Sequence, residues 1–217
     1  VIMVLENKVL QKMERGSRRI GIFSGTFDPV HKGHIAFALQ ALQEANLETI
    51  YFMPEAKPRR KEGITHYAHR TAMLEIALKP YKDLKILEVA DKQFSVVKTM
   101  PKLKAMFKND QLFLLLGSDI VNYLTNSEWP QIELLLKDFG LIVGLRGETS
   151  EESVRKQLAT LPNTMVVVKT LKKHASSREI RQASASNEDH EDSLKGTKKY
   201  IKKNWLYDSV AGSAKRS

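Results

Sequence analysis

From Arg19 to Val168 the chain alternates short apolar runs with longer stretches whose apolar residues recur every three or four positions. The first pattern is typical of buried strands and the second of amphipathic helices. The sequence predicts strands over 20–23, 49–53, 84–89, 111–116, 139–144 and 165–168, and helices over 35–45, 69–78, 96–107, 129–136 and 150–161. Strands that alternate with helices form right-handed βαβ crossovers and hence a parallel sheet. We expect an α/β protein with a doubly wound parallel sheet and helices on both faces.

Nothing interrupts this alternation, so residues 19–207 are expected to form one domain. Residues 1–18 carry an amphipathic stripe and predict an N-terminal helical extension. Residues 184–193 are polar and acidic without periodicity, which predicts a mobile loop. Helical spacing returns over 195–206, so C-terminal helices should follow the sheet. The small, polar residues 208–217 predict a disordered tail.

The composition narrows the class of protein. The 217 residues include no cysteine, which excludes disulfides and thiolate metal sites and fits a reducing cytoplasm. The N-terminus lacks the cleavage site of a signal peptide, and no apolar run approaches the ~18 residues of a membrane span. We therefore expect a cytoplasmic protein without membrane contacts. The formal net charge of +10 favours polyanionic partners, either nucleic acid or small phosphate-rich molecules.

The segment 19–35 reads as a strand, a phosphate-sized loop and the start of a helix. His31 and His34 are three residues apart, so both imidazoles can face one ligand if the helix has begun. Gly25 suits the turn, and Gly33 leaves room for a close backbone approach. Exposed amides at a helix start favour an anion. Taken alone, the two histidines are also compatible with capping and packing of a helix start. A metal site is the weaker alternative, because two ligands without a third are little evidence for zinc.

A second set of donors follows the last predicted strand. Ser176 and Ser177 precede Arg178 and Arg181 at an apparent helix start, where a serine is a plausible N-cap. Guanidinium groups bind phosphate oxygens in a planar, bidentate manner, and helix N-terminal amides add to this. In a doubly wound sheet, ligands bind beyond the carboxyl ends of the strands, so both sets should meet at one end.

The first segment resembles the signature G-x-F-D-P-x-H-x-G-H of the nucleotidyltransferase superfamily, which contains adenylyltransferases and cytidylyltransferases. The matching residues are Gly25, Phe27, Asp28, Pro29, His31, Gly33 and His34. The second resembles the I-S-S-T-x-I-R motif of the adenylyltransferase branch, with matches at Ser176, Ser177, Ile180 and Arg181 and departures at Ala175 and Arg178. The resemblance implies a Rossmann-like fold and favours ATP over CTP.

Within the superfamily the chain most resembles the bacterial nicotinate-nucleotide adenylyltransferases. The similar stretches are Pro54 to Pro58, His69 to Leu74, Gly117-Ser118-Asp119, Tyr200-Ile201 and Leu206-Tyr207. The departures lie on the acceptor side. Arg59 and Arg60 replace a proline and a histidine, the S-Y-T-x-D-T segment appears only as Phe94 to Thr99, and the tryptophan expected after G-x-D comes late as Trp129.

The resemblance implies transfer of AMP from ATP to a phosphomonoester, most closely nicotinate or nicotinamide mononucleotide, with release of pyrophosphate. It places His31 and His34 at the reacting phosphate. It assigns ATP binding to Ser24, Gly25, Thr26, Phe27, Gly33, Gly117, Asp119, Ser176, Ser177, Arg178 and Arg181, and acceptor binding to Lys57, Ser95 and Trp129. Mg²⁺ would be held mainly by ATP, with no protein ligand, and Asp28 would order the loop.

Other functions stay open at this point. A different acceptor, such as phosphopantetheine, would preserve the reaction. An aminoacyl-tRNA synthetase relative would share the histidine motif, although the chain has no K-M-S-K-S-like loop. A non-catalytic nucleic-acid-binding protein would use the basic residues alone, but they are scattered rather than interleaved with aromatics, so we expect no nucleic-acid partner. The sequence leaves a homo-oligomer open.

Overall fold

The computed structural model describes residues 17–58, 62–126, 129, 131–159, 161, 165–169, 172 and 174–208. The strands are β1 (Arg19–Gly25), β2 (Thr49–Pro54), β3 (Leu84–Ile86), β4 (Gln111–Gly117), β5 (Phe139–Gly144) and β6 (Met165–Val168). The helices are α2 (Lys32–Glu44), α3 (Tyr67–Leu78), α4 (Thr99–Met106), the 3-10 turn η1 (Ser118–Ile120), α5 (Val121–Thr125), α6 (Ile132–Asp138), α7 (Glu151–Leu158), α8 (Ser177–Ala185) and α9 (Lys195–Lys203).

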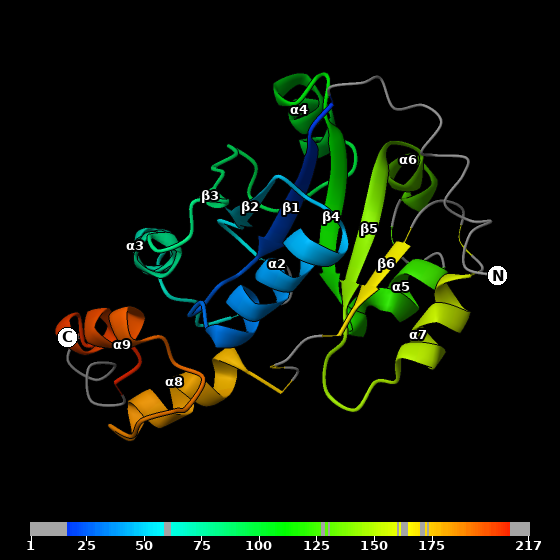
Figure 1. The fold of residues 1–217 in the computed structure, drawn as a ribbon. Coiled ribbons are helices and arrows are strands. Elements are labelled where there is room, and N and C mark those ends of the chain that lie inside the picture. Colours follow the sequence, from blue (N-terminus) through cyan, green and yellow to red (C-terminus); the bar gives the residue numbers. More distant parts are fainter. Residues whose placement is uncertain are drawn as a thin grey trace.

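The six strands form one parallel sheet in the order β3-β2-β1-β4-β5-β6 (Figure 1). The chain winds outward from β1 to β3, returns to β4 beside β1 and then winds outward the other way. The order reverses between β1 and β4, which is where open α/β sheets bind their ligands. The predicted doubly wound, Rossmann-like α/β fold is confirmed.

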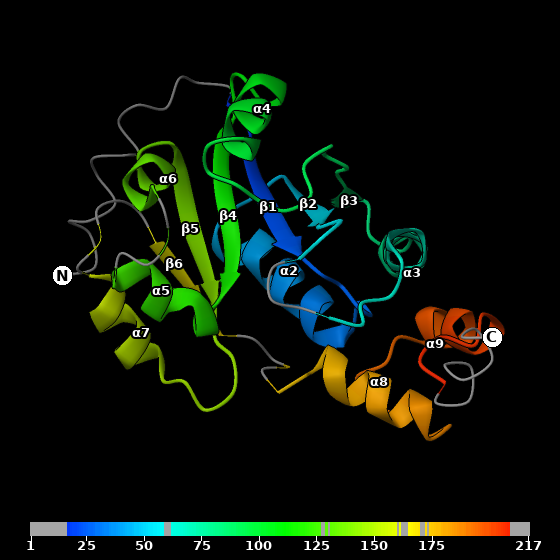
Figure 2. The ribbon, with the colours of Figure 1, turned by 180° about the vertical axis from the view of Figure 1, so that it is seen from behind.

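Two apolar layers cover the sheet because its inner strands are buried on both faces. On one face, α2 and α3 pack against β1, β2 and β4 through residues such as Phe37, Ala38 and Met73. On the other, α4 and α6 pack through Leu103 and Leu135 (Figure 2). Helix α7 joins the second face beside β5 and β6. Within the described residues, no helix has the length and apolar character needed to cross a membrane.

Several predicted elements begin or end elsewhere, and two of these shifts have a clear local cause. Strand β3 ends at Ile86, not 89, because the next ladder bond would need the N–H that Pro54 lacks. Helix α6 begins at Ile132, not 129, because Gln131 has a left-handed backbone with φ 58°. The short η1 and α5 precede it and were not predicted. Helix α4 begins at Thr99, three residues later than expected.

The C-terminal part differs more. Residues 184–185 form the last turn of α8, and Asp192 is buried. The Asp192 carbonyl accepts the Lys32 backbone N–H at 3.0 Å, and its carboxylate pairs with Lys172 Nζ at 3.3 Å. The expectation of a mobile loop over 184–193 is therefore wrong at both ends. The N-terminal extension up to residue 16 and the tail from 209 lie outside the described residues.

Candidate active site

A cavity of about 790 Å³ lies at the carboxyl ends of the strands. Every residue that the sequence assigned to catalysis or ATP binding lines it. These residues are Ser24, Gly25, Thr26, Phe27, His31, Gly33, His34, Gly117, Asp119, Ser176, Ser177, Arg178 and Arg181. Trp129 also lines the cavity, whereas Lys57 and Ser95 are not among its lining residues.

The loop between β1 and α2 is held in an unusual backbone shape by aromatic packing. Phe27 has φ 51°, a conformation that costs a non-glycine residue about 1–3 kcal/mol. Its ring is only 2% exposed and packs edge-on against Phe23 at 5.3 Å and close to Phe52 at 5.3 Å between centroids. Burial of a phenylalanine contributes about 1.5–3 kcal/mol, which is enough to hold the strained loop.

The two histidines lie together at the start of α2. His31 is the N-cap residue, and its backbone N–H donates to His34 Nδ1 at 3.3 Å. A neutral His34 whose Nδ1 accepts a hydrogen bond carries its proton on Nε2, so Nε2 is the donor nitrogen. The ring centroids are 3.7 Å apart with planes inclined by 32°. The capping that the sequence left as an alternative is therefore real, and it coexists with a position in the cavity.

His31 is electrically neutral at pH 7. Burial, together with the smaller effect of the nearby positive charge of Arg146 and against the opposing effect of Asp192, lowers its pKa from 6.5 to about 4. A neutral imidazole offers one N–H donor and no positive charge. The positive charge at this end of the cavity therefore comes from the guanidinium and ammonium groups around it.

Gly33 serves a different purpose from the one expected. A Cβ at this position would lie 2.6 Å from Ala175 Cβ and 3.0 Å from His31 Nδ1. The space beside Gly33 is therefore filled by the segment leading to α8 rather than left for a ligand. Glycine is needed because the two candidate phosphate-binding segments touch there.

Hydrogen bonds join those two segments directly. Arg181 donates from NH1 to the Asp28 carbonyl at 2.6 Å, and Ser177 Oγ donates to the Pro29 carbonyl at 2.9 Å. Ser176 is the N-cap of α8, but its hydroxyl makes no capping bond within the described residues. The donors on α8 and the histidine loop thus form one rigid unit.

The Asp28 side chain is buried and fully engaged with the protein. Its Oδ2 accepts the Thr65 backbone N–H at 3.1 Å, and its Oδ1 accepts the Tyr207 hydroxyl at 2.7 Å. These contacts agree with the expected role of Asp28 in ordering the loop.

Arg70 is a residue that the sequence did not assign to the site. Its guanidinium is buried and donates to the carbonyls of Thr26 at 2.6 Å, Thr65 at 3.0 Å and Glu55 at 2.8 Å. Burial lowers its pKa, and the charge of Asp28 partly offsets this. Hydrogen bonds to a charged group contribute about 1.5–3 kcal/mol each, so Arg70 ties the β1–α2 loop to both ends of the β2–α3 connection. Its place in the stretch His69 to Leu74, which resembles the adenylyltransferases, was the available signal.

Arg146 was also missed, although it follows strand β5 as Asp119 follows β4. Gly117 and Gly144 are in register, so the residues two positions later lie side by side. Arg146 NH1 is 3.8 Å from Asp119 Oδ1, and the Arg146 backbone N–H donates to Ser118 Oγ at 3.0 Å. Both charged side chains are about half exposed or more, so the pair contributes only about 0–1 kcal/mol and exchanges readily for a ligand.

The other end of the cavity is aromatic. Phe94 and Trp129 meet edge to face with centroids 6.4 Å apart. Glu55 Oε1 accepts the Phe94 backbone N–H at 3.0 Å and the Ser24 hydroxyl at 3.2 Å, which ties this end to β1. A planar ligand group fits beside such a pair by stacking.

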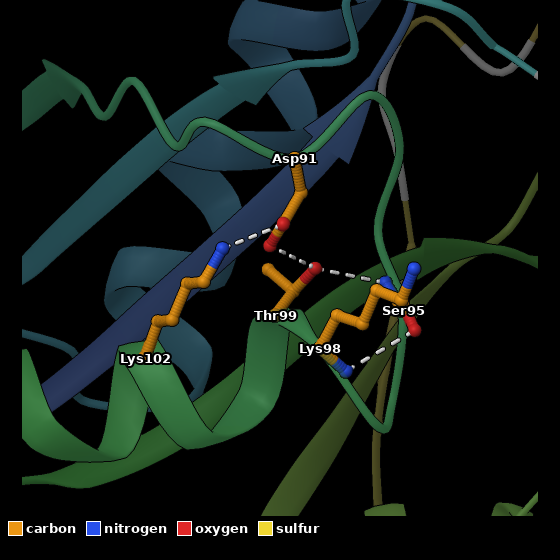
Figure 3. Close-up of polar contacts among 5 residues, drawn as sticks. All are labelled: Asp91, Ser95, Lys98, Thr99 and Lys102. Carbon is orange, nitrogen blue, oxygen red and sulfur yellow. Dashed lines mark hydrogen bonds and ion pairs between the residues drawn. The ribbon is translucent and has the colours of Figure 1, made fainter.

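Ser95 takes part in a separate network beside this end, drawn in Figure 3. Its Oγ accepts the Lys98 backbone N–H at 3.3 Å, and its own backbone N–H donates to Thr99 Oγ1 at 3.0 Å. Thr99 in turn donates to Asp91, which pairs with Lys102 Nζ at 2.6 Å. Ser95 thus closes the turn that leads into α4, whose N-cap residue is Lys98. Lys57 is exposed, and its backbone N–H donates to the Lys92 carbonyl.

A parallel sheet that presents a histidine loop and a serine-arginine helix to one cavity is the architecture of a nucleotidyltransferase. A model of the cytidylyltransferase-like family matches residues 22–183, which include both segments. The chain belongs to this family, within the group of the nicotinate-nucleotide adenylyltransferases.

Two curated relatives support that placement. The chain is 34% identical over 172 residues to the probable nicotinate-nucleotide adenylyltransferase of Carboxydothermus hydrogenoformans, covering 76% of this chain and 85% of the relative. It is 34% identical over 199 residues to the Bacillus subtilis nicotinate-nucleotide adenylyltransferase, covering 88% of this chain and all of the relative. The fold matches Plasmodium falciparum nicotinic acid mononucleotide adenylyltransferase complexed with NaAD, with a TM-score of 0.72 at 21% identity over 88% of this chain and 97% of that one.

Proposed function

We propose that the protein transfers AMP from ATP to nicotinate mononucleotide, forming nicotinate adenine dinucleotide and pyrophosphate. One observation carries the proposal: two phosphate-binding segments are hydrogen-bonded to each other at one end of a cavity whose other end is aromatic. A nucleoside triphosphate fits the first end and a planar pyridine ring the second. The activity named for the relatives is the same reaction.

The chemistry needs placement and charge stabilisation rather than a general base. The attacking phosphate is already anionic at neutral pH, so its oxygen attacks the α-phosphorus of ATP while the bond to the β-phosphate breaks. His34 Nε2 donates to the α-phosphate, which gains charge in the transition state. Arg178 and Ser176 bind the outer phosphates that leave. Holding the two reactants together lowers the barrier by making the reaction effectively intramolecular.

Mg²⁺ accompanies ATP in this proposal. The described residues contain no group of three or more His, Asp or Glu side chains placed to hold a metal, and both Asp28 oxygens are taken by protein donors. This donor set fits an ion held by phosphate oxygens and water. The ion would neutralise part of the triphosphate charge, while the residues of this chain position the triphosphate.

The decisive experiment offers acceptors in parallel. The protein is incubated with ATP, Mg²⁺ and either nicotinate mononucleotide, nicotinamide mononucleotide or phosphopantetheine, and the products are identified by mass spectrometry. We expect pyrophosphate and nicotinate adenine dinucleotide, formed faster than the nicotinamide product. Faster turnover of phosphopantetheine would keep the reaction and overturn the acceptor. Absence of pyrophosphate with every acceptor would overturn the reaction itself.

A further inference from the structure

The C-terminal segment has no assigned role in the reaction, yet it returns to the site. Helix α9 packs against α3, where Tyr200 OH is 2.9 Å from His69 Nδ1 (Figures 1 and 2). A Cβ at Gly196 would lie 2.5 Å from Ile76, so the two helices approach closely. The neighbour of His69 is Arg70, which holds the loops around the cavity. The C-terminal helix is thus anchored on the element that supports the site.

After α9 the chain turns inward at Tyr207. This residue has φ 72°, a left-handed backbone that is strained in a non-glycine residue. Its hydroxyl donates to Asp28 Oδ1 at 2.7 Å across 179 residues of sequence. Burial and the charge of Asp28 raise its pKa well above the usual value, so the hydroxyl keeps its proton at neutral pH.

The residue that receives this bond joins the two phosphate-binding segments. The Asp28 carbonyl accepts Arg181, and the next carbonyl, that of Pro29, accepts Ser177. The other carboxylate oxygen of Asp28 accepts the Thr65 N–H. A change in the Asp28 side chain therefore moves the carbonyls that set the separation of His34 from the donors on α8.

We propose that Tyr207 is a positioning residue for nucleotidyl transfer, acting through Asp28 to fix the histidine loop relative to the serine and arginine donors of α8. The inference rests on the proposed function. It assigns the Leu206-Tyr207 ending a part in catalysis without contact with substrate. A misplacement of about 1 Å at such a site costs on the order of 100-fold in rate, so loss of one of its restraints should be measurable.

Tyr200 provides a matched control because it lies in the same C-terminal segment. Its hydroxyl bonds to His69 on α3 and to no residue of the histidine loop. Tyr207→Phe and Tyr200→Phe each remove one hydroxyl and keep the ring. A role that only docks the segment predicts the same effect from both changes, whereas a positioning role predicts a catalytic defect from Tyr207→Phe alone.

The experiment measures kcat, both KM values and the melting temperature of the full chain and the two variants. We expect Tyr207→Phe to lower kcat about tenfold with KM values within twofold. Tyr200→Phe should keep kcat within twofold of wild type, and its melting temperature should fall about as much as that of Tyr207→Phe. A kcat for Tyr207→Phe within twofold of wild type, or an equal loss in both variants, overturns the inference.

Amide hydrogen exchange separates this inference from the proposed function, because it needs no substrate. We expect exchange in peptides covering 24–34 and 176–182 to accelerate in Tyr207→Phe and to stay unchanged in Tyr200→Phe. Unchanged exchange in both segments contradicts the inference whether or not the wild-type protein makes the dinucleotide. An inactive wild type with accelerated exchange in Tyr207→Phe would overturn the proposed function and retain the coupling.

Discussion

The two ends of the cavity are built in different ways. At the phosphate end, donors from α8 are bonded to main-chain carbonyls of the β1–α2 loop, and a buried arginine fixes the neighbouring loops. At the acceptor end, Phe94 and Trp129 come from separate loops and meet through ring edges. A phosphate needs donors at fixed positions, whereas a planar ring needs only an apolar surface. Rigid construction is therefore concentrated where charge develops during the reaction.

The largest expected effect is at the phosphate end. His34→Ala should lower turnover by about 10²–10³-fold, because it removes a donor to the phosphate that gains charge. The rate is measured by pyrophosphate release, and circular dichroism checks that the variant is folded. His174→Ala is the control, because His174 is exposed and does not line the cavity. A folded His34→Ala variant with the wild-type rate would show that His34 does not act on the reacting phosphate, and would contradict the proposed difference between the two ends.

The next prediction concerns pH and the buried His31. Between pH 6.5 and about 4, the unfolded chain binds a proton at this residue that the folded protein excludes. The free energy of unfolding therefore falls as pH decreases through this window, by roughly 3 kcal/mol in full. Urea unfolding of wild type and His31→Asn at pH 7 and pH 4.5 measures it.

Because asparagine does not titrate, the variant should lose less stability than wild type over that interval. Trp129→Ala, changed at the acceptor end, should keep the wild-type pH dependence. Parallel curves for wild type and His31→Asn would show that the histidine is not held neutral by the fold.

Arg146 tests whether the phosphate end extends to the strand β5. Arg146→Met should raise the KM for ATP about tenfold, because a charge-assisted bond to phosphate contributes about 1.5–3 kcal/mol. Loss of the exposed ion pair between Arg146 and Asp119 should add little to this effect. The KM for the acceptor should change less than twofold. Arg155→Met on α7 removes an equal charge from a surface ion pair and is the control. An increase confined to the acceptor KM would assign Arg146 to the other end.

The smallest effects distinguish two residues at the acceptor end. Trp129→Ala should raise the acceptor KM roughly fivefold through lost stacking. Ser95→Ala should leave that KM within twofold and lower stability by about 1 kcal/mol, because its hydroxyl accepts the Lys98 N–H at the start of α4. Steady-state kinetics and thermal unfolding measure the two effects. A Ser95→Ala variant with wild-type stability and a raised acceptor KM would return this serine to the acceptor site.

The sequence predicted the sheet, and it predicted that the candidate phosphate-binding residues would meet at one cavity, because both depend on local patterns. Apolar periodicity places the strands, and the residues after β1 and β6 form short motifs that the sheet brings to one edge. Arg146 and Arg70 were harder to assign. Their positions depend on strand register and on three carbonyls from two loops, which no short stretch of sequence records.

The acceptor end and the C-terminal segment show a second limit of sequence reasoning. Gln131 and Tyr207 adopt left-handed backbone conformations that cannot be predicted from their residue types. The first shifts the start of α6, and the second turns the chain back to Asp28. Asp192 lies in a stretch that was expected to be mobile, but it is buried and its carbonyl bonds to the start of α2, which is a tertiary contact.

The contact between Gly33 and Ala175 makes one methyl group a spacer between the two phosphate-binding segments. With no side chain at position 33, the small side chain at 175 sets how closely the helix start of α2 and the approach to α8 can lie. The side chains at positions 33 and 175 therefore share one small space. A larger residue at either position would push the two segments apart, so the spacing of the candidate phosphate donors depends on both positions together.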